Sequence, residues 1–340
     1  MSDFNPYDAY TSGLRGCEKN PRADEEFVDS VLRHGGDPDG GHVAHEWEFA
    51  DKGSGKLSLL FPAIDKIFPG ALPGPAQIWG DCVGAAAANC YLASLAQEIA
   101  DGRPDEVTGL VEGPPDIPEL GVRQGVIARE SIFAWRGWTE PNGRGKSSDG
   151  WFCSAAAKAV TEKGVLVRKA YPELGIDLTK YTRETIRLGG GTKPSDKWLA
   201  QSKLNIARTA TVVTGREQVR DFIAAGYGVF NCSMQGFSRE RNEDGFSHQR
   251  GTWAHAQCFT GYDDRAITIQ KYGQPLVLWT NSWGVWNSGG RRILGTNINI
   301  PPGSYWALAS TIDRCQCIAL SSVAGWPRRK HTTYGAAGNV

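Results

Sequence analysis

The stretch Asn281-Ser282-Trp283-Gly284 determines how this chain is interpreted, because two other distinctive stretches precede it. Gly80-Asp81-Cys82-Val83-Gly84 contains a cysteine, and Ala254-His255-Ala256 contains a histidine. A cysteine, a histidine and an asparagine can act together as a nucleophile, its base and the amide that orients the base. The three stretches are far apart in the chain, so only a folded domain can bring their side chains together.

Cys82 lies near the start of a predicted helix. The Ala-rich sequence predicts a helix over Gly80–Ala100, with Asp81 as its N-cap. Unpaired amide groups and the helix dipole at such a position lower the pKa of a thiol, and the thiolate is the nucleophilic form. We expect Gly80 and Gly84 to leave room beside the thiol for a substrate backbone. Alone this pattern is weak, because a cysteine in a helix is usually a small core residue.

His255 lies in a predicted apolar strand, Trp253–Phe259, where a histidine by itself is more often a core residue. A second apolar strand, Val277–Thr280, ends at Asn281. An amide at the end of a strand can accept the ring N–H of a histidine on the adjacent strand, and the indole of Trp283 can shield that bond from water. The other ring nitrogen then faces the thiol, so the three stretches together predict a cysteine–histidine site.

Helical patterns precede strand patterns along the chain. Further helices are predicted over Gly125–Trp138, Phe152–Lys163 and Arg216–Ala225. Alternating or apolar runs predict strands over Ala207–Val213, Gly228–Met234, Thr252–Tyr262, Ala266–Lys271, Pro275–Asn281 and Tyr305–Ser310, with a hairpin turn at Lys271–Gln274. This order predicts an α+β architecture of two lobes, a helical lobe at about residues 75–200 and a β lobe at about residues 205–320.

Composition excludes several classes of partner. Hydrophobic residues make up 40% of the 340 residues and charged residues 22%, as expected of a globular protein with a substantial core. Lys plus Arg and Asp plus Glu both number 37, and this balance argues against a nucleic-acid partner. No stretch approaches the ~20 apolar residues of a membrane-spanning helix. The start, Met1–Pro6, lacks a secretory signal, so we expect a cytoplasmic protein with no membrane association.

The eight cysteines are predicted to be reduced and mostly buried, apart from the candidate nucleophile, because a chain of 340 residues needs no disulfide framework. Cys315 and Cys317 share one face of a strand, yet no second ligand pair completes a zinc site. His34, His42 and His45 fall in a Gly-rich segment and are expected to be exposed loop residues. The sequence therefore predicts no metal and no cofactor.

Taken together, these residues resemble the papain-like cysteine peptidases. Asn281–Gly284 is similar to that family's Asn-Ser-Trp-Gly segment, and His255-Ala256 followed by Gly261-Tyr262 is similar to its His-Ala…Gly-Tyr run. Gly80–Cys82 stands where the family has Gly-Ser-Cys, and Asp149–Ala155 resembles its Gly-Gly segment and the helix that follows. The resemblance covers about residues 60–320 and identifies a divergent member. It implies a helical N-terminal lobe, an antiparallel β-barrel-like C-terminal lobe and an active site between them.

The resemblance implies a role for each site residue. Cys82 attacks the scissile carbonyl and His255 moves the proton. Asn281 orients His255, and Trp283 shields their contact. Gln77 would donate to the oxyanion, although it lies five residues before the nucleophile where the family has six.

The resemblance also implies a substrate-binding segment. Gly150 and Trp151 would hold a peptide in an extended pose. Phe152 and Ala254 would border an apolar subsite. The expected partner is therefore a peptide or protein substrate.

Three functions remain open at this point. The first is hydrolysis of peptide or isopeptide bonds, and the second is acyl transfer or cell-wall cleavage with the same triad. The third is a structural or assembly role, for example in a virus particle, with a silent site and a virion-associated location. The loop-rich N-terminal arm, residues 1–55, is expected to be either a pro-segment or a docking arm. Residues 56–324 form the predicted catalytic domain, and 325–340 a polar tail that partners could pin.

Overall fold

The computed structural model describes residues 50–101, 125–136, 150–188, 194–323, 325 and 326, and the shorter pieces 5, 7–8, 16–18, 22, 24–27, 116–117, 122–123 and 333–334. Most of the N-terminal arm, with its three histidines, and most of the C-terminal tail lie outside the described residues.

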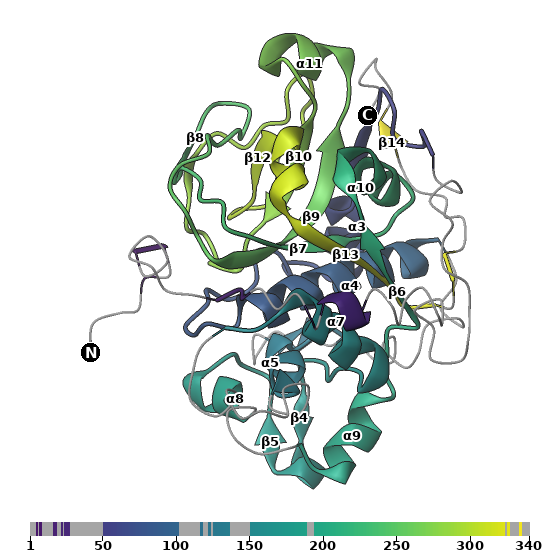
Figure 1. Ribbon diagram of the computed structural model, residues 1–340. Helices are drawn as coiled ribbons and strands as arrows, with labels where there is room; N and C mark the ends of the chain where they lie inside the picture. Colours follow the sequence, from purple (N-terminus) through teal and green to yellow (C-terminus); the bar gives the residue numbers. More distant parts are fainter. Residues whose placement is uncertain are drawn as a thin grey trace.

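An eight-stranded antiparallel sheet forms one half of the molecule (Figure 1). Its strand order is β12-β10-β9-β7-β13-β6, and β1 pairs with both β9 and β14. The bounds are β1 Leu57–Leu59, β6 Thr209–Val213, β7 Val229–Ser233, β9 His255–Asp263, β10 Leu276–Thr280, β12 Tyr305–Leu308, β13 Gln316–Ser321 and β14 Thr333–Tyr334. The predicted α+β class is confirmed, and within the described strands the sheet does not close into a barrel.

Helix α4, Cys82–Ala100, lies between this sheet and the smaller helices (Figure 1). It contacts β9 on one side and α5, Arg129–Phe133, and α7, Cys153–Glu162, on the other. Nearly all of its side chains are buried. The run of alanines suits this position, because small side chains let the helix pack closely against neighbours on every side.

Shorter elements surround this core. They are α3 Phe61–Ile67, β2 Asp116–Ile117, β3 Val122–Arg123, β4 Ala170–Tyr171, η4 Pro172–Leu174, β5 Ile176–Asp177, α8 Arg183–Arg187, α9 Asp196–Ser202, α10 Gly215–Ala224, β8 Glu240–Arg241, α11 Ala266–Tyr272, β11 Ser288–Gly289 and η5 Ala309–Arg314. Figure 1 shows α5, α8 and α9 on the side of α4 away from the sheet. In the described part, no helix is long and apolar enough to cross a membrane.

The strand predicted over Ala266–Lys271 is wrong, because these residues form α11. The alternation of apolar residues predicted a strand with one buried face. Ile267 and Ile269 are instead 43% and 38% exposed, so they do not form such a face. The carboxylate of Asp263 accepts a hydrogen bond from the Thr268 hydroxyl at 2.7 Å and turns the chain into a helix directly after β9. The predicted hairpin turn at Lys271–Gln274 is instead the end of this helix.

Within the helix predicted over Gly125–Trp138, the described residues form α5 at Arg129–Phe133 and residues 125–128 are not helical. The segment before it is extended, because Ile127 forms an antiparallel bridge with Val167. Gly84 of α4 lies against α5: a Cβ on Gly84 would be 3.1 Å from the carbonyl oxygen of Arg129. This glycine serves the close approach of two helices, and the expectation that it makes room for substrate is wrong.

A disulfide joins the two halves of the molecule. Cys153, the first residue of α7, is bonded to Cys232 on β7, with their Cα atoms 6.2 Å apart. The expectation of reduced thiols is wrong for this pair. Their separation of 79 residues gives no hint of pairing, and only the packing of α7 on the sheet brings them together.

Candidate active site

Cys82 is the first residue of α4 and is fully buried. The backbone N–H of Ala256 points at its sulfur, with a nitrogen-to-Sγ distance of 3.4 Å. Ala256 follows His255 at the start of β9. The packing of α4 on β9 therefore brings the thiol beside the histidine segment, although 173 positions separate Cys82 from His255 in the chain (255 − 82 = 173).

His255 and Asn281 are hydrogen-bonded, with Nε2 and Oδ1 2.8 Å apart. β9 and β10 are adjacent antiparallel strands, so the residue after β10 lies beside the start of β9. Asn281 Oδ1 also accepts from the backbone N–H of Ser282 at 2.7 Å, which fixes the amide with its oxygen toward the ring. Nε2 therefore carries the proton in this contact, and Nδ1 is the nitrogen left for acid–base chemistry.

Burial lowers the pKa of His255 to about 3, and its hydrogen bond to Asn281 opposes this only in part. The imidazole is fully buried, and desolvation disfavours its charged form. His255 is therefore neutral at pH 7 in this closed arrangement.

Trp283 stacks on the imidazole, with ring centroids 4.6 Å apart and planes at 29°. Trp253 and Trp286 pack on Trp283 at centroid distances of 4.8 and 5.1 Å. Gly284 follows with a φ of +62°, where a Cβ would lie 3.2 Å from that of Ala76. The motif thus needs an aromatic ring against the histidine and a glycine for the turn behind it.

Gln77 is buried and tied to the segment after Asn281. Its Oε1 accepts from the Ser282 hydroxyl at 2.8 Å, and its backbone N–H donates to the Ser282 carbonyl at 2.9 Å. Its side-chain Nε2 donates to the carbonyl oxygen of Trp79. In this arrangement a side-chain N–H of Gln77 donates its hydrogen bond within the loop that leads to Cys82.

Asp81 does not cap α4 with its side chain, contrary to expectation. It pairs with Arg129 at 3.2 Å and accepts from the Tyr181 hydroxyl at 3.0 and 3.1 Å. Burial raises its pKa to about 6, and the guanidinium of Arg129 opposes that rise. Arg129 lies 3.7 Å from the centroid of the Tyr181 ring and carries no sequence signal that would have pointed to it.

The expected substrate-binding segment is already paired with the N-terminal arm. Trp151 donates its N–H to the Gly16 carbonyl at 3.1 Å and accepts from the Glu18 N–H at 2.8 Å. The carbonyl of Ala254 accepts from the N–H groups of Gly16 and Cys17, both at 2.9 Å. Residues 16–18 thus form an extended strap between Trp151 and Ala254, the residue directly before His255. Gly150 instead donates its N–H to the Gly80 carbonyl at 3.0 Å.

Other described parts of the arm contact the same region. The Tyr7 ring stacks on Trp286 at 5.6 Å and meets Trp283 edge-on at 6.2 Å. Asp24 accepts from the hydroxyl of Ser154, near the start of α7, at 2.6 Å. The arm therefore contacts both the Trp283 side of the site and the start of α7.

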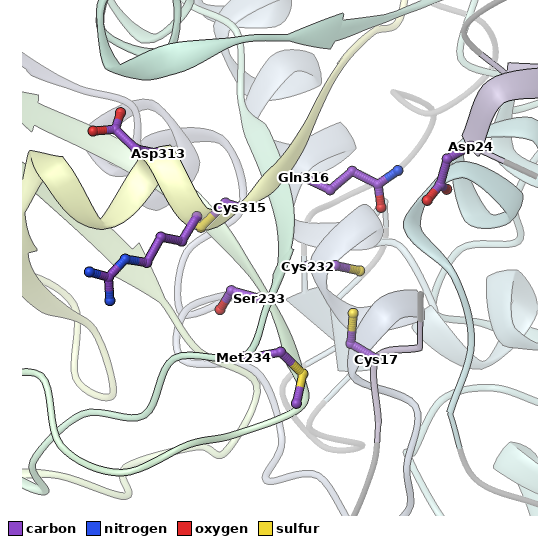
Figure 2. Close-up of a pocket in the computed structure, with 9 residues that line it drawn as sticks. Cys17, Asp24, Cys232, Ser233, Met234, Asp313, Cys315 and Gln316 are labelled. Atoms are coloured by element: carbon purple, nitrogen blue, oxygen red, sulfur yellow. The ribbon is translucent and has the colours of Figure 1, made fainter. Parts of the chain in front are cut away.

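A pocket of about 420 Å³ lies beside the strap (Figure 2). Its lining residues come from the arm, β7 and the segment before β13, namely Cys17, Asp24, Cys232, Ser233, Met234, Asp313, Arg314, Cys315 and Gln316. Phe152 and Ala254, expected to border an apolar subsite, are not among them. Within the described part of the chain, no cluster of three or more metal-ligating side chains is present.

No protein-family model and no curated protein matches the sequence. Solved structures do match. Xylellain, a cysteine protease from Xylella fastidiosa, is 15% identical over 78% of this chain and 86% of that chain, with a TM-score of 0.46. The bromelain protease from Ananas comosus is 12% identical over 78% and 98%, with a TM-score of 0.44, and proCathepsin B S9 from Trypanosoma congolense is 12% identical over 93% and 84%, with a TM-score of 0.42.

Proposed function

We propose that this protein is a cysteine peptidase that hydrolyses peptide or isopeptide bonds through Cys82, His255 and Asn281. The observation that carries the proposal is the 2.8 Å contact of His255 Nε2 with Asn281 Oδ1, beside a thiol held 3.4 Å from the Ala256 nitrogen. Thiol, imidazole and carboxamide come from three distant segments and share one buried site. A buried histidine needs a partner for its ring nitrogen, but a core role does not require a cysteine at a helix start beside it.

The geometry supports a stepwise acyl transfer. His255 takes the Cys82 proton on Nδ1, and the sulfur attacks the scissile carbonyl carbon to form a tetrahedral intermediate. The N–H groups in the first turn of α4 would stabilise the developing oxyanion. His255 then gives the proton to the leaving amine, and a water molecule deprotonated by His255 cleaves the thioester. Asn281 holds Nε2–H throughout, so the ring keeps its tautomer.

Residues 16–18 would close this site in the state described. They use the main-chain groups of Trp151 and Ala254 that an extended peptide would use, and Cys82 is fully buried. The arm must therefore leave before a substrate binds, and the peptide would replace its hydrogen bonds. This supports a pro-segment role for the arm over a docking role.

Alkylation of the full chain tests the proposal. At pH 6, iodoacetamide should modify Cys82 faster than Cys315, a partly buried thiol, once the strap has opened, and His255→Ala should abolish the difference. Asn281→Ala should weaken it. Cleavage of a peptide library then separates hydrolysis from acyl transfer, in which an added amine appears in the product.

A structural role with a silent site is the second candidate. The complete burial of Cys82 and the internal use of Gln77 favour it. Modification of Cys82 no faster than that of Cys315, both with the arm in place and after the arm is displaced, would support this candidate and refute the peptidase.

A further inference from the structure

The pocket beside the strap brings a thiol of the arm together with the disulfide. Cys17, Cys232 and Cys315 all line it. Cys232 belongs to the disulfide with Cys153, whereas Cys17 and Cys315 lie outside it and keep their thiols. Figure 2 shows the sulfur of Cys17 directed toward that of Cys232.

We propose that Cys17 exchanges with this disulfide, so that a Cys17–Cys232 bond replaces the Cys153–Cys232 bond and fastens the arm across the site. The Cys17 thiolate attacks Sγ of Cys232, the bond to Cys153 breaks, and Cys153 leaves as a thiolate that takes up the proton Cys17 released. One disulfide is consumed and one is formed, so no oxidant is needed. The effect on substrate access rests on the proposed function, but the exchange does not.

The backbone of Cys17 is held between the two bonded cysteines. Its N–H donates to the Ala254 carbonyl at 2.9 Å, directly before β9, and Cys232 lies on β7, the strand that pairs with β9. On the other side Cys17 forms a parallel bridge with Trp151, which is two residues before Cys153. These contacts keep the Cys17 thiol close to the disulfide without a search by a free chain end.

The environment selects which sulfur is attacked. Cys232 is 7% exposed and lines the pocket, whereas Cys153 is fully buried and does not line it. Cys153 is also the first residue of the ten-residue helix α7. Amide groups at that end stabilise a thiolate, and a stabilised thiolate is a good leaving group. Attack on Cys232 with departure of Cys153 is therefore the favoured direction.

Cys315 is a weaker competitor for the same disulfide. Its sulfur donates to the Thr311 carbonyl at 3.4 Å and accepts from Gln235 Nε2 at 3.5 Å. Burial raises its pKa well above the usual value, with a further contribution from Cys317 beside it. A thiol with a raised pKa supplies little thiolate at neutral pH, so Cys315 is a poor nucleophile toward this disulfide.

Disulfide mapping of the full-length wild-type chain tests the exchange directly. The protein is equilibrated in glutathione buffers of different reduced-to-oxidised ratio, quenched in acid, alkylated with iodoacetamide and digested for mass spectrometry. We expect both the Cys153–Cys232 and the Cys17–Cys232 peptides. Because the exchange has no net oxidation, their ratio should stay constant while both decline together in more reducing buffers. Finding only Cys153–Cys232 at every ratio, or a Cys315–Cys232 peptide in its place, would overturn the proposal.

A second measurement tests whether the new bond closes the site. In full-length Cys153→Ser we expect the Cys17–Cys232 bond to form. Iodoacetamide should then modify Cys82 at least about tenfold more slowly in the oxidised than in the reduced protein, because the tether raises the effective concentration of the strap. The double variant Cys17→Ser/Cys153→Ser should show equal rates in both states. Equal rates in Cys153→Ser itself would overturn the closure. An unreactive Cys82 with a constant peptide ratio would instead refute the peptidase and leave the exchange standing.

Discussion

Asp81 and Arg129 form an ion pair of 3.2 Å in which both side chains are buried. Arg129 also donates to the carbonyl of Ser282 at 3.4 Å. Asp81 directly precedes Cys82, and Ser282 directly follows Asn281. A single guanidinium therefore joins the segment of the candidate nucleophile to the segment of the candidate orienting amide.

Removal of this guanidinium should lower the free energy of unfolding by an amount that depends on pH. Arg129→Met should destabilise the protein at pH 8 by about 3–5 kcal/mol, because it leaves a buried carboxylate without its counter-ion. The pKa of Asp81 is about 6 in the folded protein and above its unfolded value, so the folded state takes up a proton as the pH falls, and this favours folding. The difference in unfolding free energy between the wild type and Arg129→Met, measured by urea unfolding, should therefore become smaller from pH 8 to pH 5.

Tyr181→Phe is the matched control for Arg129→Met, because it removes the hydroxyl that lies 3.0 and 3.1 Å from the two carboxylate oxygens of Asp81 without removing a charge. It should cost about 1 kcal/mol. A deficit of Arg129→Met that stays constant from pH 8 to pH 5 would contradict the account of Asp81.

His255 should make stability fall in mild acid. Its folded pKa of about 3 is below the ordinary histidine pKa of 6.5, so between these two pH values the unfolded chain binds the extra proton. The stabilising contribution is complete above pH 6.5 and is lost as the pH falls, by about 1.4 kcal/mol per pH unit. His255→Gln removes the titrating group, and urea unfolding at pH 7, 6 and 5 should show a shallower decline. Parallel declines for the two proteins would exclude a neutral buried imidazole.

The hydrogen bonds of the strap should control access to Cys82. Glu18→Pro deletes the N–H that donates to the Trp151 carbonyl at 2.8 Å, a loss of about 1 kcal/mol. Alkylation of Cys82 in the full chain should accelerate about fivefold if the reagent reacts when the strap opens. Glu18→Ala keeps the N–H and should match the wild-type rate. Identical rates in all three proteins would show that the strap does not limit access.

The disulfide should stabilise the fold by tying α7 to β7. In the chain-entropy description, a bond across a separation of 79 residues contributes about 4 kcal/mol. Reduction should therefore lower the melting temperature of the wild-type chain. The double variant Cys153→Ala/Cys232→Ala should start at the lower melting temperature and should not respond to reductant. A wild-type melting temperature that reductant leaves unchanged would argue that the bond does not form in solution.

Local patterns in the sequence predicted the elements that carry the candidate site. The Ala-rich run predicted α4. The apolar run that begins near His255 predicted β9, and the one that ends at Asn281 predicted β10, and the structure confirms all three elements. Local patterns failed to predict a helix that begins directly after a strand and is hydrogen-bonded to the end of that strand. Asp263 bonds to Thr268 and turns an apparently alternating run into α11.

The roles of Cys82, His255, Asn281, Gln77 and Trp283 remain predictions until the site is assayed. The sequence by itself determined the α+β class and the segments that hold these residues, because helix and strand periodicity and motif spacing are written locally in the chain. Only the tertiary structure decided the Cys153–Cys232 bond, the buried pair of Asp81 and Arg129, and the arm lying between Trp151 and Ala254. Each of these joins residues that no local pattern connects, and each exists because packing α4 and α7 on the sheet leaves those groups facing one another away from water.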